Sequence, residues 1–235
     1  MKFVFLHGLA GSARNFKYLE KQFEGAVITF DLPGYGELVH ERCKPKEYYL
    51  DYIRRKIKFN PNEKYIFLGH SMGAILAVDF ALAYPKQVKK IFLVNYPMKK
   101  QEMRSQWLYG KVGEKLRLAK ILCKTKHAWK GLLFLLLYPW YCKYTDSYWD
   151  YFKHYFETEE YHLNEFMLKD NKEKTKRIKS KVVFISGEKD KFVDFDFVKG
   201  FTHYTVKGMG HSFFEFENVI GELVRKELRK PHVCR

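Results

Sequence analysis

The sequence predicts an α/β protein built on a parallel sheet. Six short runs rich in β-branched and aromatic residues recur along the chain, and segments able to form helices separate the first four runs. Nearly continuous apolar runs of this length are typical of strands that a parallel sheet buries on both faces. The expected strands are Lys2–Leu6, Ala26–Phe30, Lys64–Leu68, Lys90–Val94, Lys181–Ile185 and Thr202–Val206.

Three segments outside these runs predict helices. Leu50–Lys58 and Ala74–Ala83 have helical character, and Pro85 ends the second of them because proline cannot continue a helix. Phe214–Arg229 has the apolar spacing of an amphipathic helix that closes the fold.

The alternation of strands and helices stops between about Pro97 and Lys179, where helix-like segments rich in Lys, Leu and aromatic residues replace it. An interval of this length is too long for a structureless loop in a compact domain. We therefore expect a main α/β domain formed by residues 1–97 and 180–235, and a helical cap, residues 98–179, inserted between the fourth and fifth strands.

The composition fits one globular domain with an inserted subdomain. The chain has 235 residues and a formal net charge of +16, but no nucleic-acid-binding motif accompanies this charge. The longest apolar stretch, Leu132–Tyr141, is too short to span a bilayer as a helix, which needs roughly 20 residues. We expect a cytoplasmic protein without a signal peptide, in which the well-separated cysteines are reduced: Cys43, Cys123, Cys142 and Cys234.

A candidate nucleophile lies between the third strand and the helix that follows it. The segment Gly69–Gly73, GHSMG, has the pattern G-x-S-x-G with Ser71 at its centre. A tight strand-to-helix turn strains the backbone, so its flanking positions must be small. The turn also exposes the serine Oγ at a helix N-terminus, where developing negative charge is favoured. The pentapeptide alone is weak evidence, but between a strand and a helix it predicts a nucleophilic serine.

The loop after the first strand, His7–Ser12 or HGLAGS, is the candidate oxyanion loop. Its glycines let a backbone N–H group approach a reacting carbonyl closely. We expect the N–H groups of Leu9 and Met72 to form an oxyanion hole, in which each donor is worth about 3–4 kcal/mol. His7 is expected to support this loop from below. The turn Asp31–Gly36, DLPGYG, is expected to support it as well, without chemistry of its own.

His211 is the candidate general base. It lies in Gly208–Ser212, GMGHS, directly after the last strand, and loops at the carboxyl ends of strands gather the ligand chemistry of α/β folds. His70 adjoins the nucleophile, but successive side chains point apart, so we expect it to pack or to hydrogen-bond locally. The other histidines lack comparable context and are expected mostly at the surface or in packing: His40, His127, His154, His162, His203 and His232.

Asp190 is the candidate acid that orients the base and stabilises its charged form. It lies in Ser186–Asp190, SGEKD, directly after the fifth strand. Glu188 comes earlier in the same turn, whereas Asp194 and Asp196 lie further along and are expected to begin a helix.

Together these segments resemble the α/β-hydrolase superfamily, in the branch that holds carboxylesterases, monoglyceride lipases and carrier-protein methyl ester esterases. The order Ser, Asp, His along the chain is the one that this superfamily uses. Its members usually carry two further strands before the first loop. The resemblance therefore implies an α/β-hydrolase fold lacking the two N-terminal strands, with six parallel strands in the order 2-1-3-4-5-6. The motifs that carry it are His7–Ser12, Asp31–Gly36, Gly69–Gly73, Ser186–Asp190 and Gly208–Ser212.

The resemblance implies a serine esterase that cleaves carboxylic esters through an acyl-enzyme, without a metal or an organic cofactor. Ser71 would attack the carbonyl carbon, with His211 as base and Asp190 as acid. Thioesterases, lyases and C–C bond hydrolases of the superfamily share this set of residues, so these reactions stay open. A catalytically silent protein that binds a ligand in the same pocket is the remaining alternative.

Two features of the expected cap bear on the substrate, which we expect to be a small-molecule or acyl-linked ester. Eleven aromatic residues fall between Tyr138 and Tyr161, and they either roof an apolar acyl pocket or pack the cap onto the core. The segment Lys99–Lys130 holds ten basic and two acidic residues, a net charge of +8. This segment is either a solvated helix face or a docking surface for an acidic acyl carrier protein or an anionic membrane.

Overall fold

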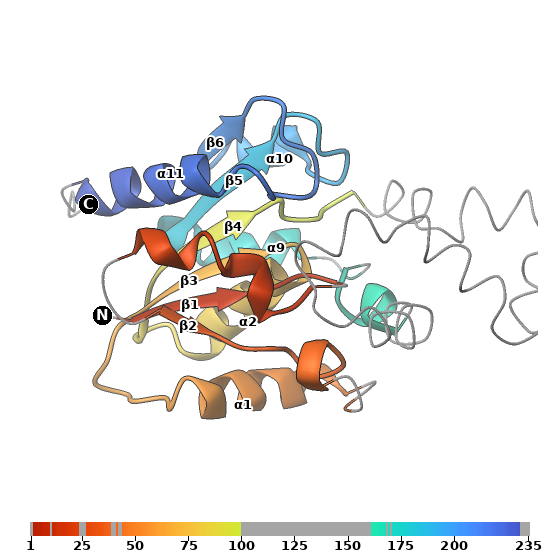
Figure 1. Ribbon diagram of the computed structural model, residues 1–235, viewed down its shortest axis with the longest axis vertical. Coiled ribbons are helices and arrows are strands. Elements are labelled where there is room, and N and C mark those ends of the chain that lie inside the picture. Colours follow the sequence, from red (N-terminus) through yellow and green to blue (C-terminus); the bar gives the residue numbers. More distant parts are fainter. Residues whose placement is uncertain are drawn as a thin grey trace, which may run out of the picture.

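The described residues form a six-stranded sheet with helices on both faces (Figure 1). The computed structural model describes residues 2–99 and 161–230, apart from positions 10, 24–26, 39–40, 42–43, 168 and 170. The strands are β1 (Lys2–Leu6), β2 (Val27–Thr29), β3 (Tyr65–His70), β4 (Val88–Val94), β5 (Val182–Gly187) and β6 (Thr202–Val206).

The strand order is β2-β1-β3-β4-β5-β6, and every neighbouring pair is parallel. The predicted fold class and strand order are therefore confirmed. The strand ends differ slightly from the predicted ones. β3, for example, continues through Gly69 and His70 up to the candidate nucleophile. The carboxyl ends of parallel strands share one edge of a sheet, so the loops after β1, β3, β5 and β6 meet there.

The three predicted helices are present with shifted ends. They are α1 (Lys46–Lys56), α2 (Met72–Ala83) and α11 (Glu217–Arg229). α11 begins later than predicted because Phe213–Phe216 forms a turn, in which the Phe216 N–H donates to the Phe213 carbonyl at 3.0 Å. The shorter elements are α9 (Lys172–Arg177), α10 (Phe195–Val198), the 3₁₀ turns η1 (Ala13–Phe16), η2 (Glu20–Gln22), η3 (Gly36–Leu38) and η5 (Lys179–Lys181), and the π-helical turn η4 (Leu163–Met167).

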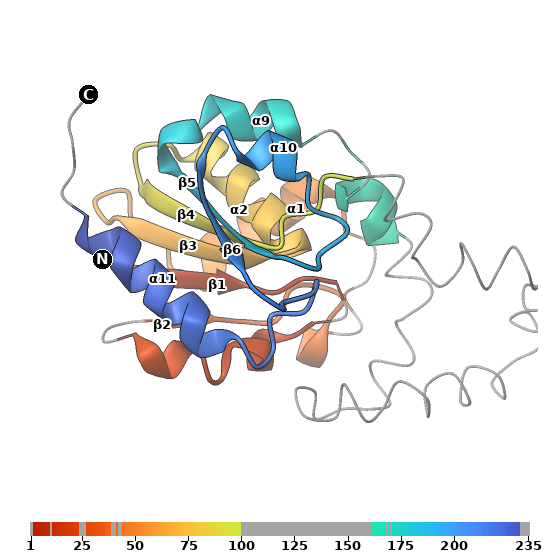
Figure 2. The ribbon, with the colours of Figure 1, turned by 90° about the horizontal axis from the view of Figure 1, so that it is seen from above.

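Each face of the sheet has its own apolar core. Figure 2 shows α1, α2, α9 and α10 on one face and α11 on the other. Tyr49 of α1 and Phe80 of α2 are fully buried in the first core. Phe16 of η1 stacks on Phe213 in the second core, with ring centroids 5.5 Å apart, and Val224 of α11 packs there too. Burial on both faces explains why the central strands read as nearly continuous apolar runs.

The second described part of the expected cap interval, within residues 161–179, lies against the main domain. Both η4 and α9 contact α2. Tyr96, just after β4, places its hydroxyl 3.0 Å from the Thr175 hydroxyl of α9. The basic segment after Lys99 and the aromatic cluster before Tyr161 fall in 100–160, outside the described residues. The inserted cap and its bounds at 98 and 179 therefore stay predictions.

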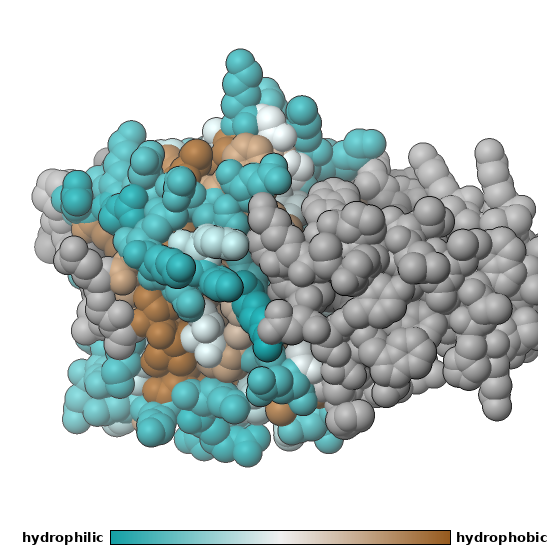
Figure 3. All heavy atoms as spheres, viewed as in Figure 1, coloured by the Kyte–Doolittle hydropathy of each residue, from teal (hydrophilic) through white to brown (hydrophobic). Residues whose placement is uncertain are grey.

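On the face drawn in Figure 3 most described side chains are hydrophilic, and hydrophobic ones gather chiefly in one area left of the centre. Tyr18 and Val219 are the large hydrophobic side chains most exposed in the part of the chain that the structure describes. Among the helices of 2–99 and 161–230, none is both long enough and apolar enough to cross a membrane.

Candidate active site

The candidate catalytic residues lie in the loops at the carboxyl edge of the sheet. Ser71 follows β3, Asp190 lies in the turn after β5, and His211 lies in the loop after β6. Leu9 lies in the loop after β1, next to β3 in the sheet. The sheet order therefore brings together residues that are far apart in the sequence.

Ser71 sits in a strained turn between β3 and α2. Its backbone has φ 53° and ψ −116°, which non-glycine residues rarely adopt. A Cβ atom at Gly69 would lie 2.5 Å from the Ala74 backbone, and one at Gly73 would lie 2.1 Å from the Leu6 carbonyl oxygen. Both flanking positions must therefore be glycine, for the steric reason that the G-x-S-x-G pattern suggests.

Ser71, His211 and Asp190 form a continuous chain of hydrogen bonds. The His211 Nε2 atom lies 2.9 Å from Ser71 Oγ, and the His211 Nδ1 atom lies 2.8 Å from Asp190 Oδ2. A carboxylate can only accept, so Nδ1 carries the ring proton and donates it to Asp190. Nε2 then accepts from the Ser71 hydroxyl, which is the arrangement that a general base requires.

The surroundings of Asp190 hold both the carboxylate and the imidazole in place. The Asp190 side chain is fully buried, while that of His211 is 28% exposed, so the base stays accessible. The second carboxylate oxygen, Oδ1, accepts from the Phe192 N–H at 2.9 Å. The Phe192 ring meets the His211 ring edge to face, with centroids 4.6 Å apart. Asp194, one of the other acids in this segment, caps α10, where the sequence predicts the start of a helix.

The loop after β1 lies directly against the nucleophile. A Cβ atom at Gly8 would lie 2.9 Å from the Ser71 Cβ atom, so only glycine permits this approach. Leu9 follows Gly8, and Met72 is the first residue of α2, where backbone N–H groups have no acceptor within the helix. Leu9 thus adjoins a residue that packs against Ser71, and Met72 follows Ser71 in the chain.

His7 ties this loop to the turn Asp31–Gly36. Its Nδ1 donates to the Gly8 carbonyl at 2.9 Å, and its Nε2 accepts from the Leu32 N–H at 2.9 Å. The bond at Nε2 requires a neutral ring, because a protonated imidazole has no acceptor. Burial lowers the pKa of His7, partly opposed by the charge of Asp31. Asp31 also accepts from the Ala13 N–H at 2.7 Å. These bonds agree with the supporting role predicted for both segments.

His70 packs against neighbouring rings, as expected, but its hydrogen bond is not local. Its Nε2 atom lies 2.8 Å from the His211 backbone carbonyl oxygen, and its ring also packs against Phe213. Burial, reinforced by the neighbouring His211, lowers the pKa of His70 to about 3. The ring is therefore neutral near pH 7 and donates from Nε2 to the loop that carries the base. His70 at the end of β3 and His211 in the loop after β6 come together only when the sheet forms. The residues around His70 in the sequence therefore could not predict this bond.

His162 has a more specific environment than its sequence context suggested. It is fully buried beside η4, with Nδ1 2.6 Å from the Tyr35 hydroxyl and Nε2 2.5 Å from the Tyr49 hydroxyl. Tyr49 donates to the Pro33 carbonyl at 2.9 Å, so its oxygen accepts from Nε2–H. His162 thus joins the segment after residue 160 to α1 and to the turn that supports the oxyanion loop.

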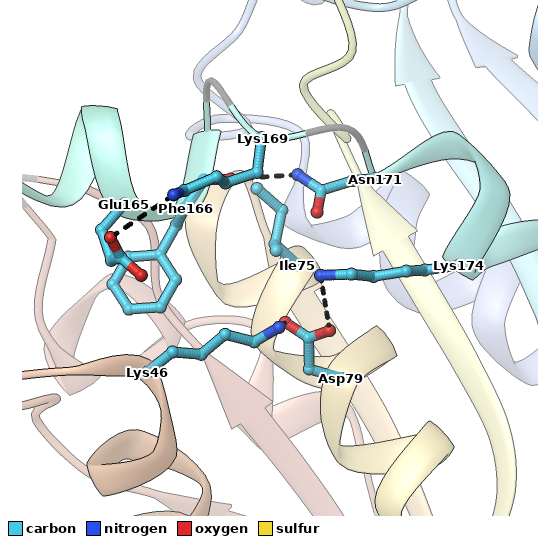
Figure 4. A pocket seen from close by; sticks show the side chains of 8 residues that line it. All are labelled: Lys46, Ile75, Asp79, Glu165, Phe166, Lys169, Asn171 and Lys174. Atoms are coloured by element: carbon cyan, nitrogen blue, oxygen red, sulfur yellow. Dashed lines mark hydrogen bonds and ion pairs between the residues drawn. The ribbon is translucent and has the colours of Figure 1, made fainter.

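A pocket of about 270 Å³ opens beside α2, and its lining includes Lys46, Asp79 and Lys174. Figure 4 shows Lys46 and Lys174 converging on Asp79, with ion-pair distances of 2.6 Å and 3.3 Å. Ser71, Asp190 and His211 do not line it, so its charged groups are separate from the candidate active site. Within 2–99 and 161–230, no group of three or more His, Cys, Asp or Glu side chains could hold a metal ion.

Comparison with protein families agrees with this fold. A family model described as alpha/beta hydrolase fold matches residues 3–215, and the chain belongs to this family. A solved alpha/beta hydrolase enzyme from a Medee basin deep-sea metagenome library superposes with a TM-score of 0.70 at 15% identity, covering 100% of this chain and 91% of that one. At this identity the likeness shows the shared fold.

The curated relatives match only part of the chain. Human epoxide hydrolase 4 is 27% identical over 99 residues, which are 40% of this chain and 27% of that protein. The pimeloyl-[acyl-carrier protein] methyl ester esterase of Pseudoalteromonas atlantica is 32% identical over 94 residues, 39% of this chain and 36% of the esterase. An epoxide hydrolase and an ester hydrolase are thus both among the relatives.

Proposed function

We propose that this protein is a carboxylic ester hydrolase that forms an acyl-enzyme on Ser71. The observation that carries the proposal is the unbroken hydrogen-bonded chain from Ser71 Oγ through His211 to the buried Asp190. The strained serine backbone supports it, because a strained elbow exposes a nucleophile to substrate. The family assignment and the esterase among the relatives support hydrolysis of an ester.

The proposed first half-reaction transfers the acyl group to the protein. His211 Nε2 takes the Ser71 proton while Oγ attacks the ester carbonyl carbon and forms a tetrahedral intermediate. The imidazolium then gives this proton to the leaving alcohol as the C–O bond breaks. Asp190 holds the ring so that Nε2 faces Ser71, and its negative charge stabilises the transient imidazolium.

The second half-reaction releases the acid. His211 removes a proton from water, the resulting hydroxide attacks the acyl carbon, and the proton returns to Ser71 Oγ as the ester bond to serine breaks. In both tetrahedral intermediates the oxyanion would accept from the N–H groups of Leu9 and Met72. The contact between Gly8 and Ser71 and the start of α2 at Met72 support this assignment.

Labelling with a fluorophosphonate probe tests the proposal directly, since the probe reacts with activated serines. The wild-type protein should be labelled and should hydrolyse a simple aryl ester, and Ser71→Ala should do neither. Ser186→Ala is the matched control, because Ser186 is fully buried in β5 and its hydroxyl has no hydrogen-bond partner among the described residues. Labelling that survives Ser71→Ala would refute the proposal.

Other reactions of the same residues are separated by substrate. A thioesterase, a lyase or a C–C bond hydrolase would use the same serine, so a panel of aryl esters, thioesters and β-diketones should be compared under one set of conditions. We expect the ester to have the highest kcat/KM. The absence of both labelling and turnover of these substrates would favour a binding protein instead.

For the substrate we propose an ester with an apolar acyl group, presented free or on an acidic carrier protein. The sequence supports this through the aromatic cluster before Tyr161 and the +8 charge of Lys99–Lys130. The name of the P. atlantica relative, an esterase of a carrier-linked ester, points the same way. Each additional buried CH₂ adds about 0.8 kcal/mol, so butyrate esters should react faster than acetate esters.

A further inference from the structure

We infer that Asn95 is a positioning residue for the base and the acid, an inference that rests on the proposed function of Ser71, His211 and Asp190. Asn95 directly follows β4. In the sheet β4 lies between β3, which leads to Ser71, and β5, which leads to Asp190. It is fully buried, and no sequence motif marks it.

Every polar group of the Asn95 side chain is used to join the two loops. Its Oδ1 accepts from the Gly187 N–H at 2.8 Å, at the start of the turn that carries Asp190. Its Nδ2 donates to the Gly210 carbonyl at 3.0 Å and to the His211 carbonyl at 2.7 Å. One planar amide therefore fixes the acid turn relative to the backbone of the base.

Asparagine suits this position for two reasons. Its backbone φ is 52°, in the left-handed region that asparagine tolerates better than most residues. Its side chain combines one acceptor with two N–H donors, which matches one N–H and two carbonyl groups. Aspartate has the same shape but, when ionised, only accepts, so it would face two carbonyl oxygens with a negative charge.

The two loops are already in contact where Asn95 joins them. A Cβ atom at Gly187 would lie 2.4 Å from the Met209 carbonyl oxygen, and the Lys189 N–H donates to that same oxygen at 2.9 Å. The His211 carbonyl receives a further bond from His70 Nε2 at 2.8 Å. The backbone of the base is thus held from β3 by His70 and from β4 by Asn95, while its ring faces Ser71.

By fixing the backbone of His211, these bonds set both of its ring distances, from Nε2 to Ser71 Oγ and from Nδ1 to Asp190 Oδ2. Without the Asn95 amide, the loop that carries His211 keeps its bond from the Lys189 N–H. It loses the bonds that tie its Gly210 and His211 carbonyls to the end of β4. A displacement of about 1 Å at a reacting group costs about 100-fold in rate. Loss of the amide should therefore lower the rate of the chemical step more than the binding of substrate.

Kinetics of Asn95→Asp and Asn95→Gly test the inference, the glycine variant keeping the left-handed backbone. We expect kcat for an aryl ester to fall about 100-fold in each, with KM changed less than about threefold. The matched control is Asn171→Ala, because Asn171 is also a buried asparagine, and its Nδ2 donates to the Phe166 carbonyl at 3.0 Å away from the site. It should lower the melting temperature but leave kcat within about twofold.

Proton NMR of protein labelled with ¹⁵N-histidine gives a second readout that needs no turnover. The proton in the bond between His211 Nδ1 and Asp190 should give a low-field signal that disappears in His211→Ala. In the Asn95 variants this signal should shift or broaden, whereas Asn171→Ala should leave it unchanged.

The two readouts separate the inference from the proposed function. If the wild-type protein neither hydrolyses esters nor labels with fluorophosphonate, the proposed function fails, yet the NMR signal still tests positioning. The inference is overturned if folded Asn95→Asp or Asn95→Gly keeps the wild-type signal, or keeps kcat within twofold in an active protein. Should one variant not fold, the other decides.

Discussion

The backbone at Gly73 packs so closely against Leu6 that a Cβ atom at position 73 would lie 2.1 Å from the Leu6 carbonyl oxygen. This contact joins the first turn of α2 to the end of β1, and therefore the nucleophile to the candidate oxyanion loop. Gly73→Ala should separate the two segments, costing about 3 kcal/mol of stability and lowering kcat. Denaturant unfolding and ester kinetics measure the two effects.

The control for this substitution is Gly200→Ala, after α10. There a Cβ atom would lie 3.6 Å from the Phe197 carbonyl oxygen, an ordinary van der Waals distance. Gly200→Ala should change neither stability nor kcat appreciably. If Gly73→Ala behaved in the same way, the close approach of α2 to β1 would not be required.

Substitutions in the hydrogen-bonded chain should have graded effects on kcat. Ser71→Ala and His211→Ala should each reduce it by about 10⁶-fold, and Asp190→Asn by about 10⁴-fold, because the base survives there while its tautomer and orientation suffer. Steady-state rates on an aryl ester and unchanged circular dichroism spectra check this. More than a few per cent of wild-type turnover in Ser71→Ala would rule out Ser71 as nucleophile.

The buried ring of His70 should make stability depend on pH. Burial lowers its pKa from 6.5 to about 3, so the unfolded chain takes up this proton below pH 6.5 while the folded chain stays neutral. The stabilising contribution is complete above pH 6.5 and is lost as the pH falls towards 3. His70→Gln removes the titration and keeps a neutral donor.

Urea unfolding of wild-type protein and His70→Gln across the range from about pH 7 to pH 4 measures this contribution. The free energy of unfolding of the wild type should fall relative to that of the variant as the pH is lowered. A difference that stays constant with pH would show that His70 does not titrate on unfolding.

His162 should contribute to stability through its bonds to Tyr35 and Tyr49. His162→Phe fills the same space but leaves the buried Tyr35 hydroxyl without this acceptor, so we expect a loss of about 1–3 kcal/mol. His203→Phe is the control, since His203 Nε2 has no hydrogen-bond partner among the described residues and its ring lies beside Phe195. Equal thermal shifts in the two variants would contradict the special role of His162.

The sequence predicted the features that depend on local pattern. The strands could be found because burial on both faces leaves continuous apolar runs, and Ser71 because its turn demands glycine on both sides. His211 and Asp190 could be named because each directly follows a strand, and the parallel sheet gathers such loops at one edge. The structure brings all three side chains together.

The features that were missed depend on pairing between distant segments. Asn95 bonds to Gly187, 92 positions away, and His162 bonds to Tyr35, 127 positions away. A buried asparagine or histidine has the same local pattern as an exposed one, and only the packed strands decide which groups it meets. The same reason explains why the bond from His70 to the His211 carbonyl was not predicted.

The position of β6 at the edge of the sheet has a consequence for folding. His211 follows this last strand, and its partner Ser71 lies 140 positions earlier in the chain. Contacts between segments so far apart form slowly, because the intervening chain must first lose conformational entropy. During refolding, helical circular dichroism should therefore recover before ester turnover. The time at which ester turnover returns would then report when β6 docks onto the sheet.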